Sequence, residues 1–168
     1  MRYLTTTIYL FIVFFASVVP AHAGETWQPE TLSSLRGVFV TADVSGSVRA
    51  AYFNSGIREK DVEAFVSRAL QQSGIRVFSR SEYLADPAKP KLRVSISTVD
   101  QPDANMMATS VAVSLRQDVY LANKQKARGT TYFAGEVYGV LFKNNLLGLE
   151  NSVMELVNDF IHDWKRSH

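Results

Sequence analysis

Residues 91–121 read KLRVSISTVDQPDANMMATSVAVSLRQDVYL and contain two runs in which apolar and polar side chains alternate. The first run covers residues 91–99 and the second covers residues 110–121. The apolar positions that share one side are Leu92, Val94 and Ile96 in the first run and Val111, Val113, Leu115, Val119 and Leu121 in the second. A period of two is typical of a strand that buries one face. We therefore expect two one-sided strands joined by a loop around Pro102.

Three more strands and two helices are expected outside this stretch. Residues 35–44, 75–79 and 130–142 are rich in β-branched and aromatic side chains, which favours strands. Residues 57–73 and 149–165 have apolar side chains spaced three or four positions apart, which predicts amphipathic helices. The predicted order is β-α-β-β-β-β-α.

One architecture satisfies all of these one-sided elements. Helices and strands with a single apolar face can bury it only against each other. We therefore predict an α+β fold, a two-layer sandwich with a mixed, mainly antiparallel sheet of about five strands. Both helices are expected on one face of that sheet, which leaves the other face open.

The N-terminal residues have the pattern of a cleavable signal peptide. Arg2 is followed by an almost unbroken apolar run over residues 8–19 and by the small-residue motif Ala21-His22-Ala23. We expect residues 1–23 to be the signal peptide, residues 24–34 a flexible lead-in, and residues 35–168 a single domain. The apolar run is shorter than the roughly 20 residues of a spanning helix, so no stable membrane anchor is expected after cleavage.

Composition restricts the compartment and the function classes. The chain has no Cys, which excludes disulfides, thiolate metal sites and attachment of a lipid to a thiol. Its 18 basic and 16 acidic residues nearly balance, so we expect no nucleic-acid partner. An exported, soluble, Cys-free domain favours the bacterial periplasm, and an extracellular location stays open.

The search for reactive groups predicts no catalytic site, no metal and no cofactor. Beyond the signal peptide the two histidines are His162, within the predicted last helix, and His168, the final residue, and neither suits a catalytic triad. Glu136 with Arg116 is the best pair for an alternative reading, a small hydrolase of unfamiliar type. That reading requires the two side chains to converge in one pocket.

Binding residues are expected at three places. Two aromatic side chains lie in a Gly-, Ser- and Asn-rich loop, several polar residues line the open sides of the predicted strands, and a basic turn covers residues 122–129. The tentative binding residues are Tyr52, Phe53, Arg93, Arg116, Tyr120, Lys124, Lys126 and Arg128. The basic turn could contact anionic lipid headgroups, or it could simply keep the hairpin soluble.

The order of elements resembles that of small exported bacterial envelope domains. The resemblance rests on SGI at residues 73–75, LRVSIS at 92–97, VAVSLRQDVYL at 111–121 and SVMELVNDFIHDW at 152–164. The chain is similar in this pattern to the amino-terminal domain of the Tol-system propeller protein, the curli-secretion lipoprotein, activators of penicillin-binding proteins and uncharacterised exported proteins of the same layout. It departs from the lipoproteins because it lacks the Cys that carries the lipid.

These observations together favour a non-catalytic binding or envelope-assembly module. The resemblance implies such a role, and the open sheet face offers a surface for it. We expect a partner protein of the envelope, or self-association through the open face. A carrier for a small apolar ligand held between the helices and the sheet is a further alternative.

Overall fold

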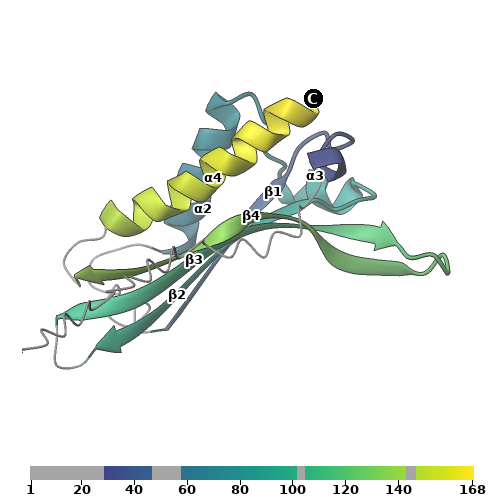
Figure 1. Cartoon of the computed structure of the whole chain (residues 1–168). Coiled ribbons are helices and arrows are strands. Elements are labelled where there is room, and N and C mark those ends of the chain that lie inside the picture. Colours follow the sequence, from purple (N-terminus) through teal and green to yellow (C-terminus); the bar gives the residue numbers. More distant parts are fainter. Residues whose placement is uncertain (1–28, 47–57, 102–104, 143–146) are drawn as a thin grey trace, which may run out of the picture.

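A computed structural model describes residues 29–46, 58–101, 105–142 and 147–168, and all structural statements below concern these residues. They form an open, mixed sheet with helices on one side of it (Figure 1). The α+β class expected from the sequence is confirmed.

The sheet contains four strands whose spatial order follows the chain. They are β1 (Phe39–Gly46), β2 (Lys91–Gln101), β3 (Met106–Tyr120) and β4 (Lys126–Phe142). β1 pairs with β2 in parallel, and the two other pairs are antiparallel. A parallel pair needs a crossover connection, and the helical segment between β1 and β2 supplies it.

The helices are the short 3₁₀ turn η1 (Pro29–Thr31), α2 (Glu59–Gln72), α3 (Arg80–Ala85) and α4 (Leu147–Ser167). Figure 1 shows α2 and α4 lying on the same face of the sheet, as expected. The hairpin of β3 and β4 extends past the helices at its turn. Among the described helices, none combines the length and hydropathy needed to cross a bilayer.

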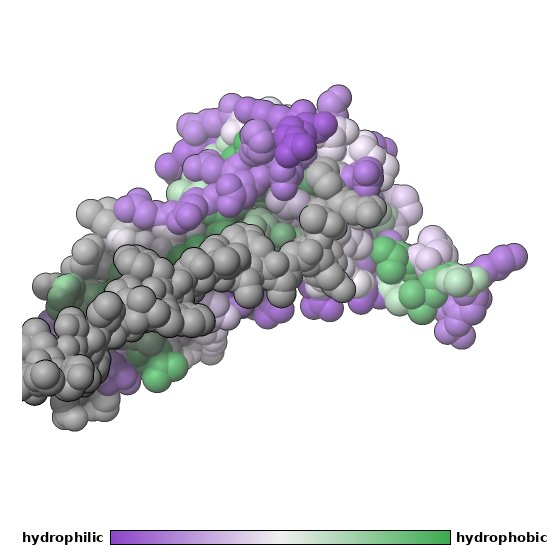
Figure 2. Space-filling model, viewed as in Figure 1, coloured by the Kyte–Doolittle hydropathy of each residue, from purple (hydrophilic) through white to green (hydrophobic). Residues whose placement is uncertain are grey.

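One continuous core fills the space between the helices and the sheet. It is built from the alternating inward side chains of the strands and from one stripe on each helix. Its largest fully buried members include Leu32, Leu70, Ile75, Leu92, Ile96, Met107, Leu115, Tyr132, Leu149 and Phe160. Figure 2 shows that the helices present a polar surface on the side away from this core.

The expectation of five strands is wrong by one. Residues 75–79 form only a single parallel bridge, between Val77 and Val38. The segment ends there because Ser79 is the N-cap of α3, with its side chain accepting a hydrogen bond from the Glu82 N–H. Because the N-cap follows so closely, this short extended segment forms one β-bridge and no continuous strand pairing. The third helix, α3, follows directly after this bridge.

Two predicted boundaries also differ. The expected lead-in, residues 24–34, overlaps the described residues from Pro29 onward, and Leu32 in it is fully buried in the core. The expected basic turn, residues 122–129, is shorter, because β4 already begins at Lys126. The pairs from Gln117 with Gly129 to Tyr120 with Lys126 extend the hairpin by four residue pairs.

Candidate functional site

The face of the sheet opposite α2 and α4 carries polar side chains in rows across the strands. One row contains Lys91 of β2 and Arg116 of β3, which are register partners. The next row contains Arg93 and Ser114, and Asp43 and Ser95 belong to the row after that. The alternation of the strands therefore gathers basic residues at one end of this open face.

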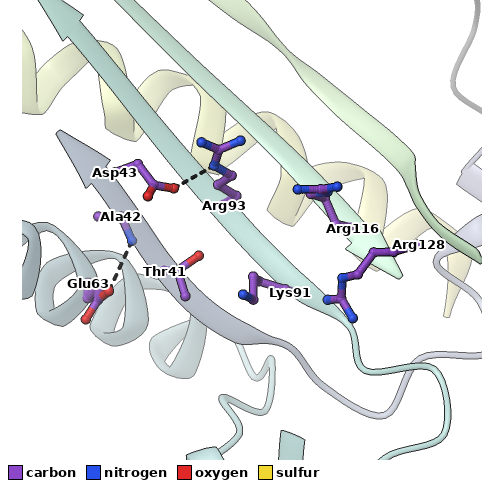
Figure 3. A pocket seen from close by; sticks show the side chains of 8 residues that line it. All are labelled: Thr41, Ala42, Asp43, Glu63, Lys91, Arg93, Arg116 and Arg128. Atoms are coloured by element: carbon purple, nitrogen blue, oxygen red, sulfur yellow. Dashed lines mark hydrogen bonds and ion pairs between the residues drawn. The ribbon is translucent and has the colours of Figure 1, made fainter. Parts of the chain in front are cut away.

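Four cations from three strands line one pocket there. The pocket has a volume of about 430 Å³. It is lined by Thr41, Ala42, Asp43, Glu63, Lys91, Arg93, Arg116 and Arg128. Figure 3 shows the side chains of Lys91, Arg116 and Arg128 over the same part of the sheet, with Arg93 further along. The four cations outnumber the two carboxylates of the lining by two charges.

Two of these cations are already paired with carboxylates. Arg93 Nε lies 2.5 Å from Asp43 Oδ2, and Arg128 Nη1 lies 2.8 Å from Asp118 Oδ1. Arg128 also donates through Nη2 to the Lys89 carbonyl oxygen at 2.9 Å. These contacts hold both guanidinium groups in fixed directions beside the pocket.

Asp118 holds two cations at once. Its other oxygen, Oδ2, lies 2.9 Å from Lys126 Nζ. Burial raises the pKa of this carboxyl, but the hydrogen bonds from Lys126 and Arg128 outweigh burial, so the net pKa is lowered from 3.8. Asp118 is thus an anion that joins the two strands of the hairpin beside the pocket.

Lys91 and Arg116 are the uncompensated pair. Within the described residues, neither of them has an ion-pair partner. Like charges directly opposite each other in a sheet are unfavourable. The Arg116 Nε is also buried, and it has no hydrogen-bond partner among the residues that the structure describes. A buried donor without an acceptor costs free energy, and an anion between the two side chains would remove both costs.

The short helix α3 contacts two of the four cations through Tyr83. Tyr83 stacks on Phe39 with ring centroids 4.8 Å apart. Lys91 Nζ and Arg128 Cζ lie 5.6 Å and 5.7 Å from the Tyr83 ring centroid. These are cation–π distances, so α3 positions two of the four cations.

The structure brings together three of the residues expected from the sequence, Arg93, Arg116 and Arg128. Tyr120 lies on the same face, but it is four residues from Arg116 along β3, about 14 Å by strand geometry, and does not line the pocket. Lys124 sits in the hairpin turn.

Three further expectations have different outcomes. Lys126 is bound to Asp118 at the rim of the site. Tyr52 and Phe53 lie outside the described residues. Glu136 accepts a hydrogen bond from Ser110 Oγ, and its register partner is Ala112, which lies four residues along β3 from Arg116. The convergence that the hydrolase alternative requires is therefore not found between Glu136 and Arg116.

Sequence reasoning missed Lys91, Asp43 and Glu63 as lining residues. Lys91 has the same parity as Arg93 in the alternating run, so that pattern contained the signal. Glu63 lies on the polar face of α2 and accepts a hydrogen bond from the Ala42 N–H at 3.1 Å. Only the packing of α2 beside β1 brings it to the pocket.

No protein-family model and no curated protein sequence matches this chain. Among the described residues, no three His, Cys, Asp or Glu side chains gather as a metal site would require.

Proposed function

We propose that this chain is an exported, non-catalytic binding module of the bacterial envelope that holds an anionic group in the pocket on its open sheet face. The observation that carries the proposal is the pair Lys91 and Arg116. Two cations face each other across strands, and the Arg116 Nε is buried without an acceptor.

The chemistry of the pocket suits an oxyanion such as a carboxylate or a phosphate. A guanidinium offers parallel N–H donors that match two oxygens of such a group, while an ammonium acts as a point charge. Arg116 would take the first role and Lys91 the second. Arg93 and Arg128, held by their carboxylates, add positive potential at the sides of the ligand.

Asp43 and Glu63 make one side of the pocket negative and thus opposite in charge to the other side. Both carboxylates belong to the β1 side of the lining, whereas Lys91, Arg116 and Arg128 belong to the opposite side. An anionic group is attracted to the cationic side and repelled from the other. The bound group should therefore lie over β2 and β3.

Titration with inorganic phosphate and with citrate tests the proposal. We expect binding at low ionic strength that weakens as salt is added. In Arg116→Gln the dissociation constant should rise at least tenfold, because about 1.4 kcal/mol or more of charge-assisted hydrogen bonding is lost. Isothermal titration calorimetry gives the constants, and the Arg116 Nε–Hε resonance should shift in NMR spectra of the wild type.

Arg68→Gln is the matched control, because Arg68 is an exposed arginine of α2 outside the pocket. It should leave affinity unchanged. Equal losses in the two variants, or no binding of either probe at millimolar concentration, would contradict the proposed site.

The export part of the proposal rests on residues 1–23 and has its own test. The chain recovered from the periplasmic fraction of a bacterial host should begin at Gly24 by intact mass. Recovery of the full-length chain in the membrane fraction would contradict a cleaved signal peptide.

A further inference from the structure

The last residues of β4 form an edge strand that lacks the usual features that prevent edge-to-edge pairing. Within the described residues, no strand pairs with the outer side of β4. Tyr138, Val140 and Phe142 point to the open face and are 74%, 65% and 58% exposed. No charged residue and no Pro occurs in residues 137–142. Natural sheets normally protect such an edge with charge, Pro or a cover.

The opposite edge of the same sheet is protected. β1 has only eight residues, and Val38, the residue before it, forms a parallel bridge with Val77. The Ala42 N–H is taken by Glu63 Oε1 from α2. Among the described residues, contacts from other segments therefore protect β1, whereas no strand pairs with the outer side of β4.

An apolar row runs across the open face to the free edge. Val99 of β2 is the register partner of Ala108 on β3, and Ala108 is the partner of Val140 on β4. Val99 is 68% exposed. An apolar row that stops at an unpaired edge is continued only by another strand that carries an apolar residue at the matching position.

The backbone of β4 is oriented for such pairing. The Gly139 carbonyl oxygen accepts a hydrogen bond from Thr109 Oγ1 at 3.3 Å, so it points toward β3. Backbone groups alternate in direction along an antiparallel strand. The N–H and C=O of Val140 are therefore directed outward, away from β3.

We propose that two copies of this chain pair antiparallel along β4, with Val140 opposite Val140 of the second copy. Tyr138 then lies opposite Phe142 of the second copy, so the open-face pairs formed by residues 138, 140 and 142 are aromatic or aliphatic and carry no charge. The row of Val99, Ala108 and Val140 is then followed by Val140, Ala108 and Val99 of the second copy, as the two-fold axis of a symmetric dimer requires. The two sheets become one sheet of eight strands.

This pairing is independent of the anion-binding proposal. Arg116 is the register partner of Thr130, ten residues before Val140 along β4. The anion pocket and the dimer edge therefore lie at opposite ends of the open face, and either can fail without the other.

Cysteine crosslinking tests the pairing directly, because the chain has no native Cys. Residues opposite each other in a hydrogen-bonded antiparallel pair have Cα atoms about 5.5 Å apart, which a disulfide can bridge. Val140→Cys should form a covalent dimer under mild oxidation. Val99→Cys is the matched control: it has similar exposure on the same face, but it lies two strands inside the edge and should stay monomeric on reducing-agent-free gels.

Sedimentation velocity supplies the second measurement. The wild type should dimerise with increasing concentration, and Val140→Lys should remain a monomer because two opposed ammonium groups would meet at the two-fold axis. Equal crosslinking at positions 99 and 140 would overturn strand pairing in favour of association face to face. A wild type that is monomeric at every concentration would overturn self-association altogether.

Discussion

Gly46 ends β1 in a backbone conformation that side chains rarely adopt. Its φ is +88°, and a Cβ built on it would lie 1.9 Å from the Thr98 carbonyl oxygen. Gly74, after α2, has a similar φ of +83°, but a Cβ there would meet nothing within 4 Å. A comparison of the two positions therefore distinguishes the free energy lost through an unusual φ from the free energy lost through a close contact with neighbouring backbone.

We expect Gly46→Ala to lower the free energy of unfolding by about 2–4 kcal/mol, because β1 must move away from β2 to accept the methyl group. Gly74→Ala should cost about 1 kcal/mol, since only its conformation is strained. Urea unfolding of the two variants and the wild type measures the difference. Equal costs would show that the approach of Gly46 to Thr98 is relieved without disturbing the sheet.

The candidate site was partly predictable at this scale. Alternation within a strand assigns Arg93 and Arg116 to a polar face, and both line the pocket. Alternation cannot say which residues of neighbouring strands share a row. The facing of Lys91 and Arg116 depends on the register between β2 and β3, and the position of Arg128 also depends on the irregularities of β4 opposite β3, so both become visible only in the folded sheet.

At the scale of elements, α3 is held by a compact set of polar contacts. The Ser79 N–H donates to Glu82 Oε2 at 2.8 Å, and the Glu82 N–H donates to Ser79 Oγ, which completes a capping box. Arg76 forms an ion pair with the same carboxylate. Through Tyr83, this short helix positions the cations Lys91 and Arg128.

The Glu82 carboxyl should make stability depend on pH in the acid range. The backbone hydrogen bond from Ser79 is the largest cause, followed by the Ser79 side chain and Arg76, and together they lower the pKa of Glu82 from 4.5 to about 2. A lowered pKa means that this contribution is complete above pH 4.5 and is lost as the pH falls toward 2.

Glu82→Gln should therefore remove part of the loss of stability that the wild type shows between these two pH values. Chemical unfolding at a series of pH values measures it, with the wild type as reference. A variant whose stability falls as steeply as that of the wild type would contradict the role of this carboxyl.

Most elements were predictable because their periodicity is long and clean. The runs at residues 91–99 and 110–121 lie within β2 and β3 except for Leu121, and the expected helices coincide with α2 and α4 to within a few residues at each end. The prediction of a strand at residues 75–79 was wrong, because the β-propensity of five residues does not reveal that a helix cap follows them.

At the scale of the whole molecule, α4 joins the sheet to η1 and to Leu35. Tyr132 of β4 and Phe160 of α4 are both buried and contact each other edge to face, with centroids 5.5 Å apart. The Tyr132 hydroxyl donates to Asp163 at 2.8 Å. His168 Nε2 lies 3.0 Å from the Leu35 carbonyl oxygen.

Phe160→Ala should lower the free energy of unfolding by about 3–5 kcal/mol, because it leaves a cavity in the single core. Tyr132→Phe keeps the ring and removes one hydrogen bond, so it should cost about 1 kcal/mol. Thermal unfolding followed by circular dichroism and by calorimetry measures both. Two separate transitions in either variant would contradict a single cooperative core.

The spatial order of the strands has a consequence for the rate of folding. β2, β3 and β4 are neighbours in both the sheet and the chain, and α4 follows β4 directly. Most native pairings therefore close short loops, whose entropy cost is small. Among the strand pairings of the described sheet, the parallel pairing of β1 with β2 closes the longest loop, because the segment between these strands contains α2 and α3. We expect the β2–β3–β4 meander to form early and the docking of β1 to limit the rate of folding.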